Sequence, residues 1–143
     1  MRAYGYDDKD RSFGFVKING EELTRHKGRG ITVVTITKDC KAGEITNYDT
    51  HGSSSDADKL RDYLTNLPSE TRLAVISEDS FHHQLGSAKS VLTQLGVDTS
   101  STRGLRSSLC FFSVKGKPES TLQSEAARYK GPATLSVPLT CEK

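Results

Sequence analysis

The stretch "HKGRGITVVTI", residues 26–36, places a glycine-flanked arginine directly before an apolar run. From Gly30 to Ile36 the chain is β-branched almost throughout, which is typical of a strand covered on both faces. The glycines on either side of Arg29 indicate a turn that displays the arginine rather than packing it. The turn "DCKAGE" and the run "EITNYDT" follow. Together these segments predict a β-hairpin with Arg29 at the start of its first strand.

The apolar pattern on both sides of this hairpin predicts further elements. Before it, "SFGFVKINGEEL" alternates and runs into Asn19-Gly20, which predicts a strand entering a tight turn. After it, apolar residues recur at helical spacing, serine and aspartate residues at 53–56 offer N-caps, and Pro68 ends the pattern. A second helical pattern runs from Leu85 to Leu95 and ends at Gly96.

Three more apolar segments predict strands, namely "RLAVISED", "SLCFFSVKG" and "ATLSVPL". The polar segment 115–132 is predicted to be a long surface loop. The resulting order, β-β-β-α-β-α-β-β, favours an α+β fold with two helices packed on a sheet. A Rossmann fold is not expected, because no glycine-rich fingerprint joins a strand to a helix.

Length and composition bound the protein's class. The 143 residues suit a single domain, 1–143, and 34% of them are hydrophobic. The 20 basic and 18 acidic residues are scattered, with no basic block, so nucleic acid is not an expected partner. No apolar run is long enough for a bilayer, so membrane insertion is not expected. The first fifteen residues show no signal peptide.

The three cysteines fit no metal-binding spacing. Cys110 lies in an apolar run and is expected to be a small buried hydrophobe. Cys40 and Cys141 could bridge each other or a second chain, and the sequence leaves this open.

Other candidate chemistry finds little support, so no enzyme activity and no cofactor are predicted. His82 and His83 could bind a metal with Glu78 or Asp79, but adjacent side chains on a helix point apart and no third ligand is apparent. The neighbours Glu78 and Asp79 face opposite sides of a strand, unlike a glycosidase pair. "GKP" and "GRG" are too short for a phosphate loop.

Four charged residues at strand ends form the candidate site. Arg29 begins one predicted strand, Glu78 and Asp79 end another, and Arg106 precedes a third. Strand ends and their loops are where binding sites are usually built, and arginine with carboxylate supplies planar donors and acceptors. From spacing alone the alternative, a surface ion pair contributing about 0 to 1 kcal/mol, is favoured.

Six motifs resemble the interleukin-like EMT inducer domain: "FVKINGEEL", "GRGITVVTI", "NYDTHGS", "LAVISEDSF", "AKSVLTQLG" and "GLRSSLCFFSVKG". They occur in order from about Phe13 to Gly116. The family includes pancreatic-derived-factor cytokines, hyaluronan-binding proteins that induce cell migration, and the stem of protein O-mannose N-acetylglucosaminyltransferase. The resemblance implies a compact β-β-α fold, with two β-sheets and short helices packed beside them, and no catalysis.

The resemblance also implies a sugar site. The transferase stem binds a terminal β-linked N-acetylglucosamine, and its binding residues fall on Arg29, on Asp79 or Glu78, and on Arg106. This chain differs from the stem at two positions. It has Leu105 where the stem has a tryptophan, and Ser107 where the stem has an acidic residue. Gly28 and Gly30 are expected to let the backbone approach the sugar.

The sequence therefore predicts an extracellular lectin that binds glycans or glycoproteins. A single shallow sugar site binds near millimolar, so a homo-oligomer, most simply a dimer, is expected. The alternative is a secreted cytokine-like ligand with an apolar patch in the 115–132 segment. The four-cysteine framework of the cytokine members is absent, which argues against it. A glycan-acting enzyme would need a second carboxylate, for which Asp49 is the candidate.

Overall fold

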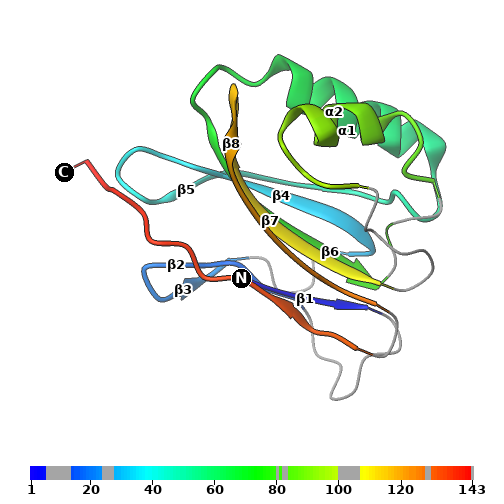
Figure 1. The fold of residues 1–143 in the computed structure, drawn as a ribbon, viewed down its shortest axis with the longest axis horizontal. Helices are drawn as coiled ribbons and strands as arrows, with labels where there is room; N and C mark the ends of the chain where they lie inside the picture. Colours follow the sequence, from blue (N-terminus) through cyan, green and yellow to red (C-terminus); the bar gives the residue numbers. More distant parts are fainter. Residues whose placement is uncertain are drawn as a thin grey trace.

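A computed structural model describes residues 1–5, 14–23, 28–79, 81, 84–99, 107–127 and 130–142. Within these residues the chain forms nine strands and two helices (Figure 1). In chain order they are β1 (Arg2–Gly5), β2 (Lys17–Ile18), β3 (Glu21–Glu22), β4 (Gly30–Ile36), β5 (Ala42–Tyr48), α1 (Ser54–Asn66), β6 (Arg72–Asp79), α2 (Ala88–Gln94), β7 (Ser108–Val114), β8 (Lys117–Ala126) and β9 (Ala133–Thr134).

Seven of the described strands form one sheet, and β2 and β3 form a separate two-stranded sheet. The large sheet runs β5-β4-β6-β1-β9, with β7 also beside β6 and β8 beside β7. Strand β6 pairs with β7 as far as Ile76 and then with β1, in parallel, at Glu78 and Asp79. Where β7 leaves β6, the Ser77 hydroxyl accepts the N–H of Leu109 at 2.8 Å, so a side chain replaces the lost backbone pairing.

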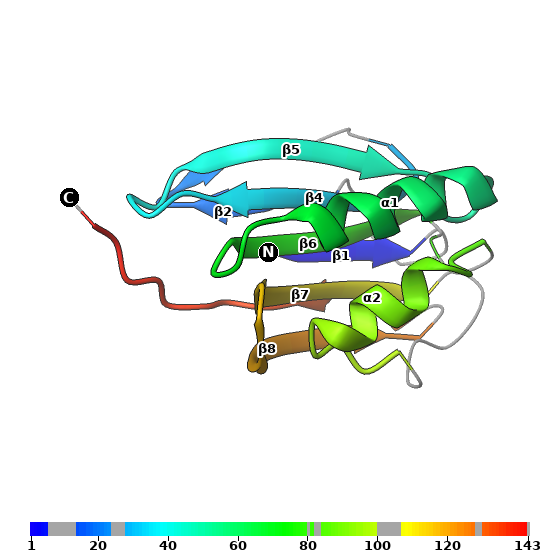
Figure 2. The ribbon, with the colours of Figure 1, turned by 90° about the horizontal axis from the view of Figure 1, so that it is seen from above.

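The large sheet has an apolar core on each face. Helices α1 and α2 cover one face, where their leucines pack against alternate residues of β4, β6 and β7 (Figure 2). The β2–β3 hairpin and the segment 135–139 pack against the other face. The predicted α+β fold, with two sheets and short helices beside them, is therefore confirmed.

Both predicted turns are confirmed. Strands β4 and β5 pair antiparallel with Ile31 opposite Tyr48, which gives the expected hairpin. Asn19 and Gly20 join β2 to β3 with φ values of 51° and 85°. Positive φ at both central positions is the conformation that an Asn-Gly hairpin turn requires.

The first helix is confirmed and the second is shorter than predicted. The Ser53 hydroxyl caps α1 by accepting the N–H of Asp56 at 3.1 Å. Helix α2 begins at Ala88 rather than at Leu85, because Gly86 with φ +34° interrupts the helical backbone. Leu85 is nevertheless buried. Its place in the apolar pattern therefore reflects packing in the core, not a position in the helix. Gly96 follows α2 with φ +93°, as expected for the residue after a helix.

Two predictions about strands and loops are wrong, and one strand was not predicted at all. The predicted loop at 115–132 contains the ten-residue strand β8, whose outer edge has no partner strand among the described residues. Strand β1 was not predicted, since four residues are too short to show a period. Of the predicted strand 133–139 only Ala133 and Thr134 pair, and the chain beyond them is extended without forming a strand.

The open question about the cysteines has an answer in the structure. Cys40 and Cys141 form a disulfide that ties the C-terminal segment to the β4–β5 turn. The backbone N–H of Glu142 donates to Lys38 O, and Arg72 donates to Thr140 O, so this end of the segment is held at several points. Cys110 is buried with a free thiol, as predicted, and burial raises its pKa to about 11.

Neither described helix is long and apolar enough to cross a membrane.

Candidate functional site

Four strand ends meet at one end of the large sheet. Gly30, the first residue of β4, lies opposite Glu78 near the end of β6, and Ile31 lies opposite Tyr48 at the end of β5. Arg29 therefore stands just beyond β4, beside the last residue of β6. Strand β7 begins at the same end of the sheet, at Ser108. We call this region the sheet end, defined by Arg29, Asp49, Asp79 and Ser107.

An arginine–carboxylate pair stands at the sheet end. Arg29 Nε donates to Asp49 Oδ1 at 2.9 Å, and Arg29 Nη2 donates to Asp49 Oδ2 at 2.6 Å. The two side chains are 44% and 33% exposed, so the pair faces solvent. Two parallel hydrogen bonds fix the plane of the guanidinium against the carboxylate, which a single contact would not do.

Hydrogen bonds within the loop after β5 and to the start of α1 fix the position of Asp49. The backbone N–H of Gly52 donates to Asp49 Oδ1 at 2.9 Å, and the N–H of Asp49 donates to Asp56 Oδ2 at 2.8 Å. Asp56 lies in the first turn of α1. The pKa of Asp49 is lowered, first by its hydrogen bond from Arg29 and then by backbone N–H donors. The carboxylate is therefore charged and fixed at neutral pH.

Two glycines make room for this arrangement. A side chain on Gly30, which has φ +105°, would place its Cβ 2.0 Å from Tyr48 O. A Cβ on Gly52 would lie 2.4 Å from Arg29 Nη2. We expected the glycine at position 30 to let the backbone come close to a sugar. In the structure, the absence of a side chain on Gly30 makes room for the neighbouring strand β5. Gly28 has more space, with Asn47 Oδ1 at 3.4 Å.

Glu78 is directed into the protein. Its residue is 6% exposed, and Oε1 accepts the N–H of Gly14 at 3.3 Å. This hydrogen bond connects β6 to the chain that enters the β2–β3 hairpin. The sequence left open whether Asp79 or Glu78 is the acidic residue of the candidate site. In the structure the Glu78 side chain makes its contact inside the protein.

The other two predicted site residues are less fully described. Asp79 is the last residue of β6, and its backbone lies opposite Gly5 of β1. Arg106 lies outside the described residues, as do His82 and His83. Ser107, which follows Arg106, is buried at 3% exposure next to the start of β7. The backbone thus brings Arg29, Asp79 and the residue after Arg106 to the same end of the sheet.

No metal site is found in the part of the chain that the structure describes. No group of three or more histidine, cysteine or acidic residues there is close enough to hold an ion.

Comparisons with known proteins show which family the chain belongs to. The sequence matches the family described as interleukin-like EMT inducer over residues 29–117, which is more than half of the chain. The chain belongs to the interleukin-like EMT inducer family. It is also similar to the cell migration-inducing and hyaluronan-binding protein of Mus musculus, with 30% identity over 115 residues. That alignment covers 76% of this chain and 8% of the mouse protein.

The family match runs from Arg29 to Lys117 and so contains the whole sheet end. The resemblance inferred from the six motifs is confirmed. In this interleukin-like EMT inducer chain, Asp49 pairs with Arg29 at the sheet end, whereas sequence reasoning considered it only for a glycan-acting enzyme. The signal was present in the predicted hairpin, because a strand returning from residue 42 brings Tyr48 opposite Ile31 and Asp49 beside Arg29.

Proposed function

We propose that this chain is a non-catalytic carbohydrate-binding module whose sugar site lies at the sheet end. The observation that carries the proposal is the solvent-facing pair of Arg29 and Asp49, with hydrogen bonds of 2.9 and 2.6 Å. A sugar hydroxyl both donates and accepts hydrogen bonds, so a fixed guanidinium beside a fixed carboxylate matches it. Each such bond replaces one to water and gains only about 0.5 to 1.5 kcal/mol.

The residues have distinct tasks in this proposal. Arg29 and Arg106 donate hydrogen bonds to hydroxyls of the sugar ring, and Asp79 accepts hydrogen bonds from those hydroxyls. Asp49 holds Arg29 in the orientation that this requires. Glu78, being buried, supports the backbone and does not touch the sugar. The first ligand to test is a terminal β-linked N-acetylglucosamine, following the transferase stem that the sequence resembles. The second is hyaluronan, because the mouse relative is named as hyaluronan-binding.

A glycan array tests the proposal, with the protein displayed as a tetramer so that weak sites are detected. We expect binding by the native chain and loss of at least tenfold in signal for Arg29→Ala and for Arg106→Ala. Arg29→Lys keeps the charge but loses the paired geometry, so it should bind less well than the native chain. Arg61→Ala is the matched control, because Arg61 is 41% exposed and pairs with Asp58 and Asp62 on α1.

Two outcomes would count against this function. Glycan binding that survives both Arg29→Ala and Arg106→Ala would rule out the sheet end. Absence of any glycan binding would return attention to the alternative, a secreted ligand for a protein receptor. That alternative required an apolar patch in the segment 115–132, where the described residues form β8 and expose one large apolar side chain, Leu122.

A further inference from the structure

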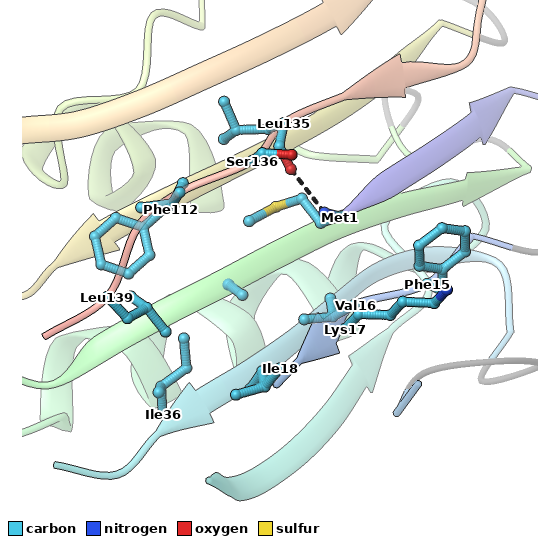
Figure 3. Close-up of a pocket in the computed structure, with 12 residues that line it drawn as sticks. Met1, Phe15, Val16, Lys17, Ile18, Ile36, Phe112, Leu135, Ser136 and Leu139 are labelled. Atoms are coloured by element: carbon cyan, nitrogen blue, oxygen red, sulfur yellow. Dashed lines mark hydrogen bonds between the residues drawn. The ribbon is translucent and has the colours of Figure 1, made fainter. Parts of the chain in front are cut away.

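A hollow of about 300 Å³ lies on the face of the large sheet opposite the helices (Figure 3). Its floor is made by Ile36, Ala74 and Phe112, from three adjacent strands of the sheet. One wall is the chain from 15 to 18 leading into the β2–β3 hairpin, and the other is the segment 135–139. This face is remote from the helices and contributes nothing to the Arg29–Asp49 pair.

Hydrogen bonds and a disulfide hold the walls of the hollow in place. The Met1 amino group donates to Leu135 O at 2.7 Å (Figure 3), and the Leu135 N–H donates to Met1 O at 3.0 Å. A few residues later the disulfide Cys40–Cys141 anchors the same segment. The hollow therefore exists before anything binds, which lowers the entropic cost of binding.

The hollow is open to solvent, and ligand sites on proteins are usually concave surfaces of this kind. Its volume lies at the lower end of the range for small-molecule sites, about 300 to 1,000 Å³. At about 30 Å³ for each non-hydrogen atom, it holds roughly ten atoms of a ligand. Apart from Lys17 and Ser136, every side chain that lines it is apolar.

The charge at the rim selects the ligand. Lys17 is the charged side chain in the lining, and no acidic residue lines the hollow. Lys17 Nζ lies 5.2 Å from the centre of the Phe15 ring, and Arg2 Cζ lies 5.4 Å from the same ring. Glu22 on β3 is the cross-strand neighbour of Lys17, but Glu21 and Glu22 are both exposed, and among the described residues neither forms an ion pair with Lys17.

We propose that this hollow binds the hydrocarbon chain of a medium-length fatty carboxylate, with about ten carbons, and that Lys17 binds its carboxylate. The apolar side chains of the lining match the chain, and Lys17, which forms no ion pair in the described part of the protein, matches the head group. The site is separate from the sheet end, so the Arg29→Ala variant binds the ligand as the native chain does.

The first test needs no variant. In native protein with labelled isoleucine methyl groups, decanoate is titrated and followed by NMR below its micelle concentration. We expect saturable shifts at Ile18 and Ile36, which line the hollow, and none at Ile31, which packs in the helix-side core. Octanoate should bind about fifteenfold more weakly, at about fourfold for each methylene removed. No saturable shift at Ile18 and Ile36, or equal shifts at Ile31, would overturn the proposal.

The second test addresses the charge. Decanol, which is neutral, should bind about two- to fivefold more weakly than decanoate. Lys17→Gln should remove this difference, and Lys89→Gln, which removes an exposed lysine of α2, should keep it. Decanol binding as tightly as decanoate to the native chain would contradict the assigned head group.

The third test fills the hollow. Ala74 is 2% exposed and its side chain lies on the floor, so Ala74→Leu places its added atoms in the empty space. We expect at least a tenfold loss of decanoate affinity with no loss of thermal stability. A stable Ala74→Leu protein that still binds decanoate as the native chain does would refute the location. If this variant does not fold, the native-protein titration decides alone.

Discussion

Gly30 is the position where the β4–β5 hairpin leaves least room for a side chain. Gly30→Ala would place a Cβ 2.0 Å from Tyr48 O at φ +105°, so both a backbone clash and an unfavourable conformation are incurred. We expect a loss of about 3 kcal/mol or more in the free energy of unfolding, measured in urea. Gly20→Ala is the control, since Gly20 has φ +85° but no atom within 4 Å, and it should cost about 1 kcal/mol. Equal losses would show that the clash is relieved by movement of the hairpin.

Asp49 makes part of the stability depend on pH. Its folded pKa is lowered mainly by Arg29, so the pair stabilises the fold above the ordinary aspartate pKa of about 3.9 and loses this as the pH falls through the lower folded value. At pH 7, Asp49→Asn should cost about 0.5 to 1 kcal/mol in the free energy of unfolding, because the pair is partly exposed.

The difference between Asp49→Asn and the native chain should therefore shrink as the pH is lowered towards 2. Urea unfolding at several pH values measures it. Asp62→Asn is the control, since Asp62 pairs with Arg61 on the exposed side of α1. A difference that stays constant down to pH 2 would show that the charge of Asp49 is not responsible.

Lys115, in the turn between β7 and β8, contacts the C-terminal end of helix α1. Lys115 Nζ donates to the carbonyl oxygens of Leu64, Thr65 and Leu67 at 2.5, 2.9 and 3.3 Å. Leu64 O also accepts the N–H of the C-cap residue Leu67 at 3.4 Å, but the last carbonyls of a helix lack their usual i+4 donor. A cation at this end also interacts favourably with the negative end of the helix dipole. Lys115→Met should therefore cost about 1 to 2 kcal/mol in thermal or urea unfolding.

The neighbouring Lys117 gives the matched control. It pairs with Glu70 at 3.4 Å, and its side chain is 52% exposed, so Lys117→Met should change stability by less than about 0.5 kcal/mol. Similar losses in both variants would mean that general charge, and not the helix end, accounts for the effect.

Uniform burial along a segment is what allowed the three central strands of the large sheet to be predicted. Strands β4, β6 and β7 bury nearly every described side chain, so their composition alone reports them. Strand β8 has exposed and half-buried positions, none that is fully buried, and contains Pro118, so it has the composition of a loop. Its hydrogen bonds to β7 form through the backbone, which composition does not report. Pro118 is tolerated there because, within the described part of the chain, β8 pairs with β7 alone and leaves its other edge unpaired.

The candidate site shows the same limit. Arg29 could be identified from its flanking glycines and from the family motifs, which are local features. Its partner Asp49 is 20 residues away and depends on the register of the hairpin, which pairs Ile31 with Tyr48. The burial of Glu78 depends on Gly14, 64 residues away, and no local pattern encodes that contact.

The disulfide links the β4–β5 turn to the C-terminal segment over a sequence separation of 101 residues. Closing so long a loop restricts the unfolded chain, so Cys141→Ser should cost about 2 to 4 kcal/mol in the free energy of unfolding. Native protein should lose a similar amount when reductant is added, and Cys141→Ser should be insensitive to reductant. Cys110→Ala, which removes the buried free thiol, should keep the native sensitivity. A native protein whose stability ignores reductant would contradict this.

Weak sugar binding by one sheet end has a consequence for assembly. A shallow site held by a few hydrogen bonds is expected to bind near millimolar, about −4 kcal/mol. Linking two such sites raises the apparent affinity by roughly 10² to 10⁴. We therefore predict that the chain forms a dimer in analytical ultracentrifugation and crosslinks glycan-coated beads, while Arg29→Ala stays dimeric and does not crosslink them. A strict monomer that crosslinks the beads would refute this, because one sheet end on each molecule cannot bridge two beads.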